Sequence, residues 1–292
     1  MPSTLRDLGE NAVLERILAT LRPAAPMLVG PGDDCAVVAR DAAWDTLLKT
    51  DVVVEGIHFT RDTAPERIGR KALARAVSDI AAMGGIPEHA LITLLVHPNR
   101  SVAAVEGIYK GISALAAQFG ISIAGGETAA LPYDGLVINV ALTGRVEAGA
   151  AILRSGGSPG DLIYVSGPLG GSFPSEHHLD FTPRIELARA ILSAGIRPSA
   201  MMDLSDGVAA DLPRLAAASR CGFEITPHLV PCNPGCTVKQ ALSDGEDYEL
   251  LLTLPAEQSH LLSASNIKLF PIGVLTESPQ NQLSGGWQHF SH

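Results

Sequence analysis

The spacing of apolar residues predicts a regular succession of helices and strands in the first half of the chain. Apolar positions recur every three or four residues over residues 10–21, 65–83 and 101–119, which is the period of an amphipathic helix. Ser101 is the expected N-cap of the third helix, and Gly120 is its expected end. Strands are predicted where β-branched and apolar residues cluster or alternate, at residues 35–39, 46–54, 89–96, 121–124 and 135–146.

A turn-rich segment, SGGSPGD at residues 155–161, separates this half from the rest of the chain. It places the best domain boundary at about residue 150, with domains at residues 1–149 and 150–292. Beyond it, a helix capped by Thr182 with Pro183 at its first position is expected, and a second helix at residues 206–219 should bend or restart at Pro213. The other predicted elements are a short helix at 255–265 and strands at 162–165, 223–226, 248–254 and 270–274.

The order of these elements decides the fold class. Some neighbouring strands are close enough for hairpins, whereas others are joined by helices. This mixture favours an α+β fold over a doubly wound parallel sheet. The N-terminal domain is expected to be mixed α/β, and the C-terminal domain α+β.

Composition and charge restrict the function. The chain has 292 residues, of which 46% are hydrophobic, so it can bury a substantial core. Its net charge is −10 and no dense run of Lys and Arg occurs, which argues against binding to the phosphate backbone of a nucleic acid. No apolar stretch approaches the ~20 residues of a membrane helix, and the first residues do not resemble a secretory signal, so no membrane partner and a cytoplasmic location are expected.

Acidic residues next to glycines or at the ends of predicted elements are the strongest chemical signal. Each alone is best explained as a turn former or a helix cap, but six such segments together make that explanation less convincing. Asp79 is the most telling, because it lies near the end of a helix, where the helix dipole disfavours a carboxylate. The six segments are Gly32-Asp33-Asp34, Thr50-Asp51, Ser78-Asp79, Gly125-Gly126-Glu127, residues 203–207 and Gly245-Glu246-Asp247.

Carboxylates that converge repel one another unless divalent cations neutralise them. Oxygen ligands without a neighbouring His or Cys pair favour Mg²⁺, or Mn²⁺ in its place, over zinc. Several such ions would let an acidic protein bind a nucleotide through its phosphates. The sequence lacks a GxxxxGK[ST] phosphate loop, the protein-kinase HRD and DFG motifs and a GxGxxG motif after a strand, so the common nucleotide folds are disfavoured. Serine hydrolases are disfavoured too, because the GxSxG match at residues 156–160 lies in a turn-rich segment and not in an elbow between a strand and a helix.

Seven segments, in order and over nearly the whole chain, resemble the thiamine-monophosphate kinases. This family belongs to the aminoimidazole ribonucleotide synthetase-like superfamily, so the resemblance implies the two-domain fold of that superfamily and a nucleotide site without a phosphate loop. It also implies transfer of the γ-phosphoryl group of ATP to thiamine monophosphate, giving thiamine diphosphate, by a homodimer joined through its N-terminal domains. The segments are GPGDDCAVV, KTDVVVEGIHF, KALARAVSDIAAMGGIP, GGETAAL, LRSGGSPGDLIYVSGPLGGS, MMDLSDGVAADL and ALSDGEDYELLLTLP.

The resemblance also assigns site residues. Metal ligands are implied at Asp34, Thr50, Asp51, Asp79, Glu127, Asp203 and Asp206. Nucleotide contacts are implied at Tyr109, Gly126, Glu127, Arg154 and Ser205, and substrate contacts at His58, Glu246 and Trp287. Asp51, Asp79, Arg154 and Asp206 are the residues expected to act directly in the transfer, with Arg154 supplying a guanidinium to the moving phosphoryl group.

Three features depart from the family pattern. Lys49 replaces a Ser or Thr that helps to hold a metal, Glu127 replaces an Asp, and the segment after Gly171 is short. Lys49 would therefore either contact a phosphate or displace one metal ion, and the short segment would alter a lid or the edge of the substrate pocket. Two alternatives remain: another ATP-dependent enzyme of the superfamily, and a catalytically weakened nucleotide-binding paralogue, which the three departures suggest.

Overall fold

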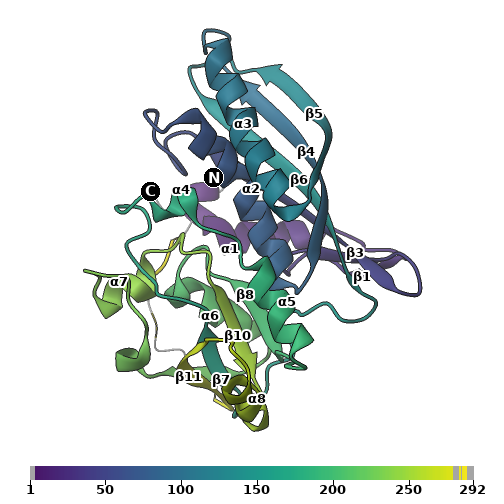
Figure 1. The fold of residues 1–292 in the computed structure, drawn as a ribbon, viewed down its shortest axis with the longest axis vertical. Helices are drawn as coiled ribbons and strands as arrows, with labels where there is room; N and C mark the ends of the chain where they lie inside the picture. Colours follow the sequence, from purple (N-terminus) through teal and green to yellow (C-terminus); the bar gives the residue numbers. More distant parts are fainter. Residues whose placement is uncertain (1–3, 279–282, 284, 288–292) are drawn as a thin grey trace.

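Two β-sheets, each with its own helices, lie at opposite ends of the molecule (Figure 1). The computed structural model describes residues 4–278, 283 and 285–287. The first sheet is built from residues before 148, and the second from residues after 161. The predicted boundary at residue 150 falls in the connection between them, and the division into domains at 1–149 and 150–292 stays a prediction.

The N-terminal sheet has six strands in the order β1-β2-β3-β6-β4-β5. All its neighbours are antiparallel except β4 and β5, which are parallel and joined by a crossover helix. Residues on β6 alternate between buried and half-buried positions, as the sequence pattern predicts for a strand with one face on a core. The strands are β1 (Met27–Val29), β2 (Ala36–Ala39), β3 (Trp44–Val54), β4 (Ile86–Val96), β5 (Ser122–Ala130) and β6 (Leu136–Glu147).

Two long helices, α2 (Pro65–Ala82) and α3 (Val102–Phe119), pack against this sheet and each other. The caps predicted for α3 are confirmed, since the Ser101 hydroxyl accepts a hydrogen bond from the amide of Ala104 and Gly120 has a left-handed φ of 67°. Glycines let the two helices approach closely: a Cβ atom on Gly69 would lie 1.9 Å from the carbonyl oxygen of Ile108. Helix α2 also contacts α4 (His177–Asp180), α5 (Ile185–Ser193) and β8 (Ala200–Asp203), so it connects the two halves of the molecule.

The C-terminal sheet has five antiparallel strands in the order β8-β10-β7-β11-β9. The apolar run of β10 is buried on both faces: Leu250 and Leu252 join the core around α2, whereas Leu251 joins a second core around α6. The strands are β7 (Leu162–Val165), β8 (Ala200–Asp203), β9 (Gly222–Ile225), β10 (Leu250–Leu254) and β11 (Phe270–Thr276). The helices outside the first sheet are α1 (Leu5–Leu18), α4 (His177–Asp180), α5 (Ile185–Ser193), α6 (Val208–Ala218), α7 (Val238–Ser243) and α8 (Ser259–Ala264).

The α+β class is confirmed, and most predicted elements are found within a few residues of their expected bounds. Two expectations are wrong. Helix α5 begins at Ile185 after Arg184 and has no side-chain cap, so Thr182 does not cap it. Helix α6 continues through Pro213 as one helix, so it does not restart there, and the alternative of a bend stays a prediction. The short elements β1, β8, α4 and α7 were not predicted, because three to six residues carry too little periodicity. No helix in the described part of the chain is long and apolar enough to cross a membrane.

Candidate active site

Two adjoining cavities lie between the halves of the molecule. The acidic cavity has a volume of about 330 Å³ and is lined by Glu10, Leu14, Lys49, Asp51, Arg75, Asp79, Arg154, Asp203, Ser205, Asp206, Arg214 and Tyr248. The aromatic cavity has a volume of about 320 Å³ and is lined by Ile57, His58, Arg75, Phe173, Ser205, Asp206, Asp244, Glu246, Tyr248 and Trp287. Four residues, Arg75, Ser205, Asp206 and Tyr248, line both cavities and form a shared wall.

Three buried carboxylates converge beside the acidic cavity. Asp34 lies in the turn before β2, Asp79 in the last turn of α2 and Asp203 at the end of β8, and each offers an oxygen within 4.8 Å of the other two. Burial raises the pKa of Asp79 well above its ordinary value, and burial together with the charge of Asp34 raises the pKa of Asp203 to about 6. Oδ2 of Asp34 is buried without a hydrogen-bond partner among the described residues. A cation among these oxygens would relieve both the repulsion and the missing contact.

Basic side chains balance part of this charge. Nζ of Lys49 lies 2.7 Å from Oδ1 of Asp79, so this ammonium binds a carboxylate of the cluster directly. Asp203 instead accepts a hydrogen bond of 2.6 Å from the Ser78 hydroxyl. The other pairs are Arg154–Asp34 at 2.5 Å, Arg75–Asp51 at 3.1 Å and Arg214–Asp206 at 2.5 Å. Both positive and negative groups therefore lie at the cavity, in pairs, and a site for metal ions and phosphates needs both.

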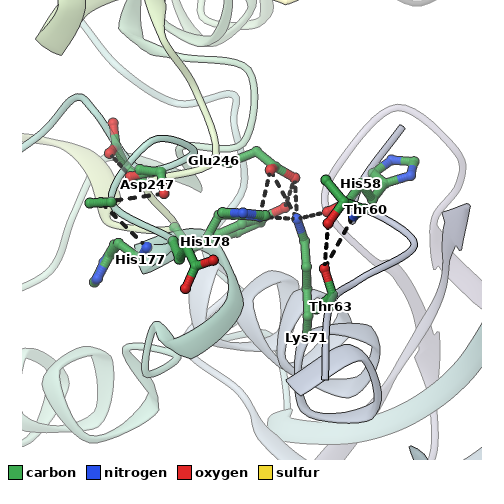
Figure 2. A network of polar contacts seen from close by, with 12 residues as sticks. His58, Thr60, Thr63, Lys71, His177, His178, Glu246 and Asp247 are labelled. Atoms are coloured by element: carbon green, nitrogen blue, oxygen red, sulfur yellow. Dashed lines mark hydrogen bonds and ion pairs between the residues drawn. The ribbon is translucent and has the colours of Figure 1, made fainter. Parts of the chain in front are cut away.

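A buried polar network supports the aromatic cavity (Figure 2). Lys71 of α2 is fully buried, and its Nζ donates to the carbonyl oxygen of His58 at 2.5 Å and to the Glu246 carboxylate at 2.8 and 2.9 Å. Nδ1 of His178 lies 2.6 Å from the same ammonium and 3.2 Å from Glu246. The network thus ties the N-terminal half to the 245–248 segment and to α4.

The electrostatics of this network fix the charge of two groups at the cavity. Although burial opposes ionisation, the hydrogen bond with His178 and the charge of Lys71 lower the pKa of Glu246 to about 2. Burial, with the nearby charge of Arg75, lowers the pKa of His58 to about 4, so its imidazole is neutral at neutral pH. Glu246 and Tyr248 have φ values of 56° and 53°, a strained backbone that is common at functional sites.

The structure brings most of the predicted site residues together. Asp51, Asp79, Arg154, Asp203, Ser205 and Asp206 line the acidic cavity, and Asp34 lies directly beside it. His58, Glu246 and Trp287, assigned to the substrate, all line the aromatic cavity. The amide of Trp287 donates to the carbonyl oxygen of Asp206, which anchors the C-terminal segment at the shared wall.

Four of the predicted site residues lie away from both cavities. The strand registers place Thr50 and Glu127 on the outer face of the six-stranded sheet, opposite the face on which α2 packs. Gly126 lies beside Glu127 on β5, and Tyr109 of α3 packs against the core. The Thr50 hydroxyl donates to Asn139, and the Glu127 carboxylate accepts from the amide of Thr128. The roles assigned to these four residues stay predictions.

Sequence reasoning missed several residues of the site. Intervals of four residues separate Lys71 from Arg75 and Arg75 from Asp79, so all three lie on one face of α2. They contact the network, the shared wall and the acidic cavity, respectively. Helix α2 carries three further charged residues, so this spacing alone does not single the three out in the sequence. Arg214 of α6 and Tyr248 are likewise recognisable only in the folded chain.

Comparisons with known proteins agree on one family. The chain matches the family models described as AIR synthase related protein, N-terminal domain, over residues 32–146, and C-terminal domain, over residues 158–285. A thiamine-monophosphate kinase of Rhodopirellula baltica is 33% identical over 276 residues, covering 88% of this chain and 85% of the relative. That of Aquifex aeolicus is 32% identical over 324 residues, covering 98% and 99%. A solved structure, AaThiL complexed with AMPPCP and TMP, matches with a TM-score of 0.87 at 31% identity and covers 99% of both chains.

Proposed function

The chain belongs to the thiamine-monophosphate kinases, within the AIR synthase related proteins, and we propose that it transfers the γ-phosphoryl group of ATP directly to thiamine monophosphate across its shared wall. One observation carries the proposal: a cavity lined by carboxylates and cations adjoins a cavity lined by aromatic side chains, with four residues in common. The first suits metal-bound phosphates, and the second suits the rings of the acceptor.

The acidic cavity would hold Mg²⁺ or Mn²⁺. Asp34, Asp79 and Asp203 supply only oxygen ligands, and the buried Oδ2 of Asp34 has no partner among the described residues, so the donor set fits a hard divalent ion. A bound ion of this kind neutralises phosphate oxygens and lowers the barrier to transfer. Arg154 and Arg214, both at this cavity, would bind the remaining phosphate oxygens of ATP.

The aromatic cavity would hold thiamine monophosphate. Thiamine contains a cationic thiazolium ring, which stacks favourably on aromatic faces and is attracted by a carboxylate. Phe173, Tyr248 and Trp287 supply the aromatic faces, and Glu246 supplies a fixed negative charge. The acceptor's phosphate would then lie toward the shared wall.

The transfer needs no covalent nucleophile from the protein. A phosphate oxygen of the acceptor forms a bond to Pγ while the bond between Pγ and the β,γ-bridging oxygen breaks, and the electron pair of that bond leaves with ADP. The protein aligns the two phosphates and neutralises their charge.

We also propose that the active form is a homodimer. The outer face of the six-stranded sheet exposes Leu48, Val52 and Leu91, which are between 40% and 49% accessible and form an apolar surface. A partner covering this face would also bring Thr50 and Glu127 to the interface. Light scattering should give twice the mass of one chain, and Leu91→Glu should lower the measured mass. A monomeric mass of the wild type at micromolar concentration would refute the dimer.

Because ATP is the co-substrate, we place the enzyme in the cytoplasm.

Turnover tests the proposed function directly. Purified protein incubated with ATP, Mg²⁺ and thiamine monophosphate should form thiamine diphosphate and ADP in equal amounts, and excess EDTA should stop the reaction. Tight ADP binding without any product would instead identify a catalytically weakened paralogue.

A further inference from the structure

Arg75 occupies a unique position in the site. It lies on α2 one turn before Asp79 and lines both cavities. Of the four described residues in the shared wall, it alone is a cation, because the others are Ser205, Asp206 and Tyr248. Arg154 and Arg214 line only the acidic cavity.

The guanidinium of Arg75 is only partly satisfied by the protein. Its Nε donates to Oδ2 of Asp51 at 3.1 Å, and this contact fixes the orientation of the planar group. Nη1 is buried without a hydrogen-bond partner among the described residues, and the side chain as a whole is 13% exposed. A buried N–H group without an acceptor is costly, so a site of this kind is built to receive an anion.

The position of the group indicates which anion it receives. Two phosphates must meet at the shared wall, one from the nucleotide in the acidic cavity and one from the acceptor in the aromatic cavity. In the proposed function, metal ions and two other arginines bind the phosphates of the nucleotide. In the described chain, the aromatic cavity is lined by no cation other than Arg75. The phosphate with the greater need of a cation is therefore that of the acceptor.

We propose that Arg75 binds the phosphate of thiamine monophosphate and holds it in line with Pγ of ATP. The proposal rests on the function proposed above and adds a substrate contact to it. A guanidinium can bind two phosphate oxygens side by side, which leaves the third free to attack. Asp51 is then a positioning residue, because it acts on the substrate through Arg75.

Ligands with and without the phosphate give a specific test. Affinities for thiamine and thiamine monophosphate are measured by calorimetry, with Mg²⁺ and a non-hydrolysable ATP analogue present, for wild type and Arg75→Met. The ratio of the two affinities isolates the contribution of the phosphate. This ratio should fall by about ten- to a hundredfold in Arg75→Met, while the affinity for thiamine itself should hardly change.

A matched control is Arg67→Met, on the same helix and also paired with carboxylates, but outside both cavities. It should keep the wild-type ratio. If Arg75→Met fails to fold, Arg75→Gln decides the question, because a glutamine keeps a polar side chain but removes the charge, so an unchanged ratio in that variant overturns the proposal.

The outcomes separate this inference from the function on which it rests. If wild type converts thiamine monophosphate but a folded Arg75→Met retains the full ratio, Arg75 does not bind the acceptor's phosphate and the proposed function stands. If wild type shows neither turnover nor a preference for the phosphorylated ligand, both are wrong.

Discussion

The two cavities have almost the same volume and share a wall, yet they are stabilised in opposite ways. Around the aromatic cavity, the buried ammonium of Lys71 has contacts to a carbonyl, a histidine and a carboxylate without any ligand (Figure 2). At the acidic cavity, buried atoms of Asp34 and Arg154 have no hydrogen-bond partner in the described chain, and the same holds for Nη1 of Arg75 in the shared wall. The network behind the aromatic cavity is therefore satisfied in the free protein, whereas groups at the acidic cavity and the shared wall are left for ligands to satisfy.

This difference follows from the task of each region. A ring system is recognised by shape and needs a preformed cavity, so its supporting network must be satisfied in advance. Phosphates and metal ions bring charge with them, and the protein can leave groups of both signs unsatisfied until they bind. The acidic cavity therefore reduces the stability of the free protein, and ligands that bind there should raise the melting temperature.

The largest effect is expected from Asp203→Asn. The substitution removes one charge of the buried carboxylate cluster at nearly constant shape, so the rate should fall by about a hundred- to a thousandfold and Mn²⁺ binding should weaken strongly. The metal-free variant should be at least as stable as wild type, because repulsion between carboxylates is relieved. Initial rates, Mn²⁺ titration and thermal unfolding test this, with the exposed Asp134→Asn as control. Normal Mn²⁺ binding would exclude Asp203 as a ligand.

The carboxylate cluster could be predicted from the sequence, but the polar network behind the aromatic cavity could not. Asp79 could be singled out because a carboxylate at a helix C-terminus is locally unfavourable, and such a cost is visible in a sequence. Asp34 and Asp203 could be singled out only as members of a set of six acidic segments beside glycines or at the ends of predicted elements. Lys71 could not, since a lysine on a helix normally faces solvent, and only the packing of α2 between both halves buries it. The alternation along β3 places Thr50 on the opposite face from Lys49 and Asp51, and the period of two along a strand makes this separation predictable from the sequence.

Breaking the network should destabilise the protein even without ligand. In Lys71→Met the carboxylate of Glu246 loses its buried ammonium, so the free energy of unfolding should fall by about 3–5 kcal/mol. Urea denaturation measures the loss. The double variant Lys71→Met/Glu246→Gln should recover part of it, since no unpaired charge is left. If the single variant is as stable as wild type, the network does not support the aromatic cavity.

Asp247 gives a pH test of the same region. Burial raises its pKa from an ordinary 3.8 to about 6, although hydrogen bonds from Ser172 and the Gly170 amide oppose the shift. The folded state then binds the proton more tightly than the unfolded state, so this group's contribution to stability is present below pH 3.8 and is lost as the pH rises through 6, by up to about 3 kcal/mol. Asp247→Asn should lack this loss. Relative to wild type, the variant should therefore gain stability between pH 4.5 and 7 in urea denaturation, and a constant difference would contradict the shifted pKa.

A substitution of Lys49 tests how a cation at the acidic cavity affects metal binding. Its contact with Asp79 favours the alternative in which this ammonium takes the place of a metal ion over the one in which it binds a phosphate. Lys49→Thr should raise the affinity for Mn²⁺ by about tenfold and add a bound ion, because a fixed positive charge beside the ligands is removed. Counting bound Mn²⁺ by electron paramagnetic resonance, with the exposed Lys110→Thr as control, measures this. An unchanged count in Lys49→Thr would refute the replacement of a metal ion by this residue.

The smallest effect is expected at Trp287, where the two cavities can be told apart most cleanly. The indole lines only the aromatic cavity and is 40% exposed, so its stacking on the acceptor's rings should contribute only about 1 kcal/mol. In Trp287→Ala the affinity for thiamine monophosphate should fall about fivefold, and the affinity for thiamine by the same factor, because the phosphate is bound elsewhere. The affinity for the ATP analogue should stay at the wild-type value. The variant keeps the backbone amide of Trp287, which donates to Asp206 at the shared wall. A loss of nucleotide affinity would therefore come from the missing indole and not from a broken backbone contact. Calorimetric titrations with the three ligands therefore decide the assignment: weaker nucleotide binding with unchanged acceptor binding would move Trp287 from the acceptor's site to that of ATP.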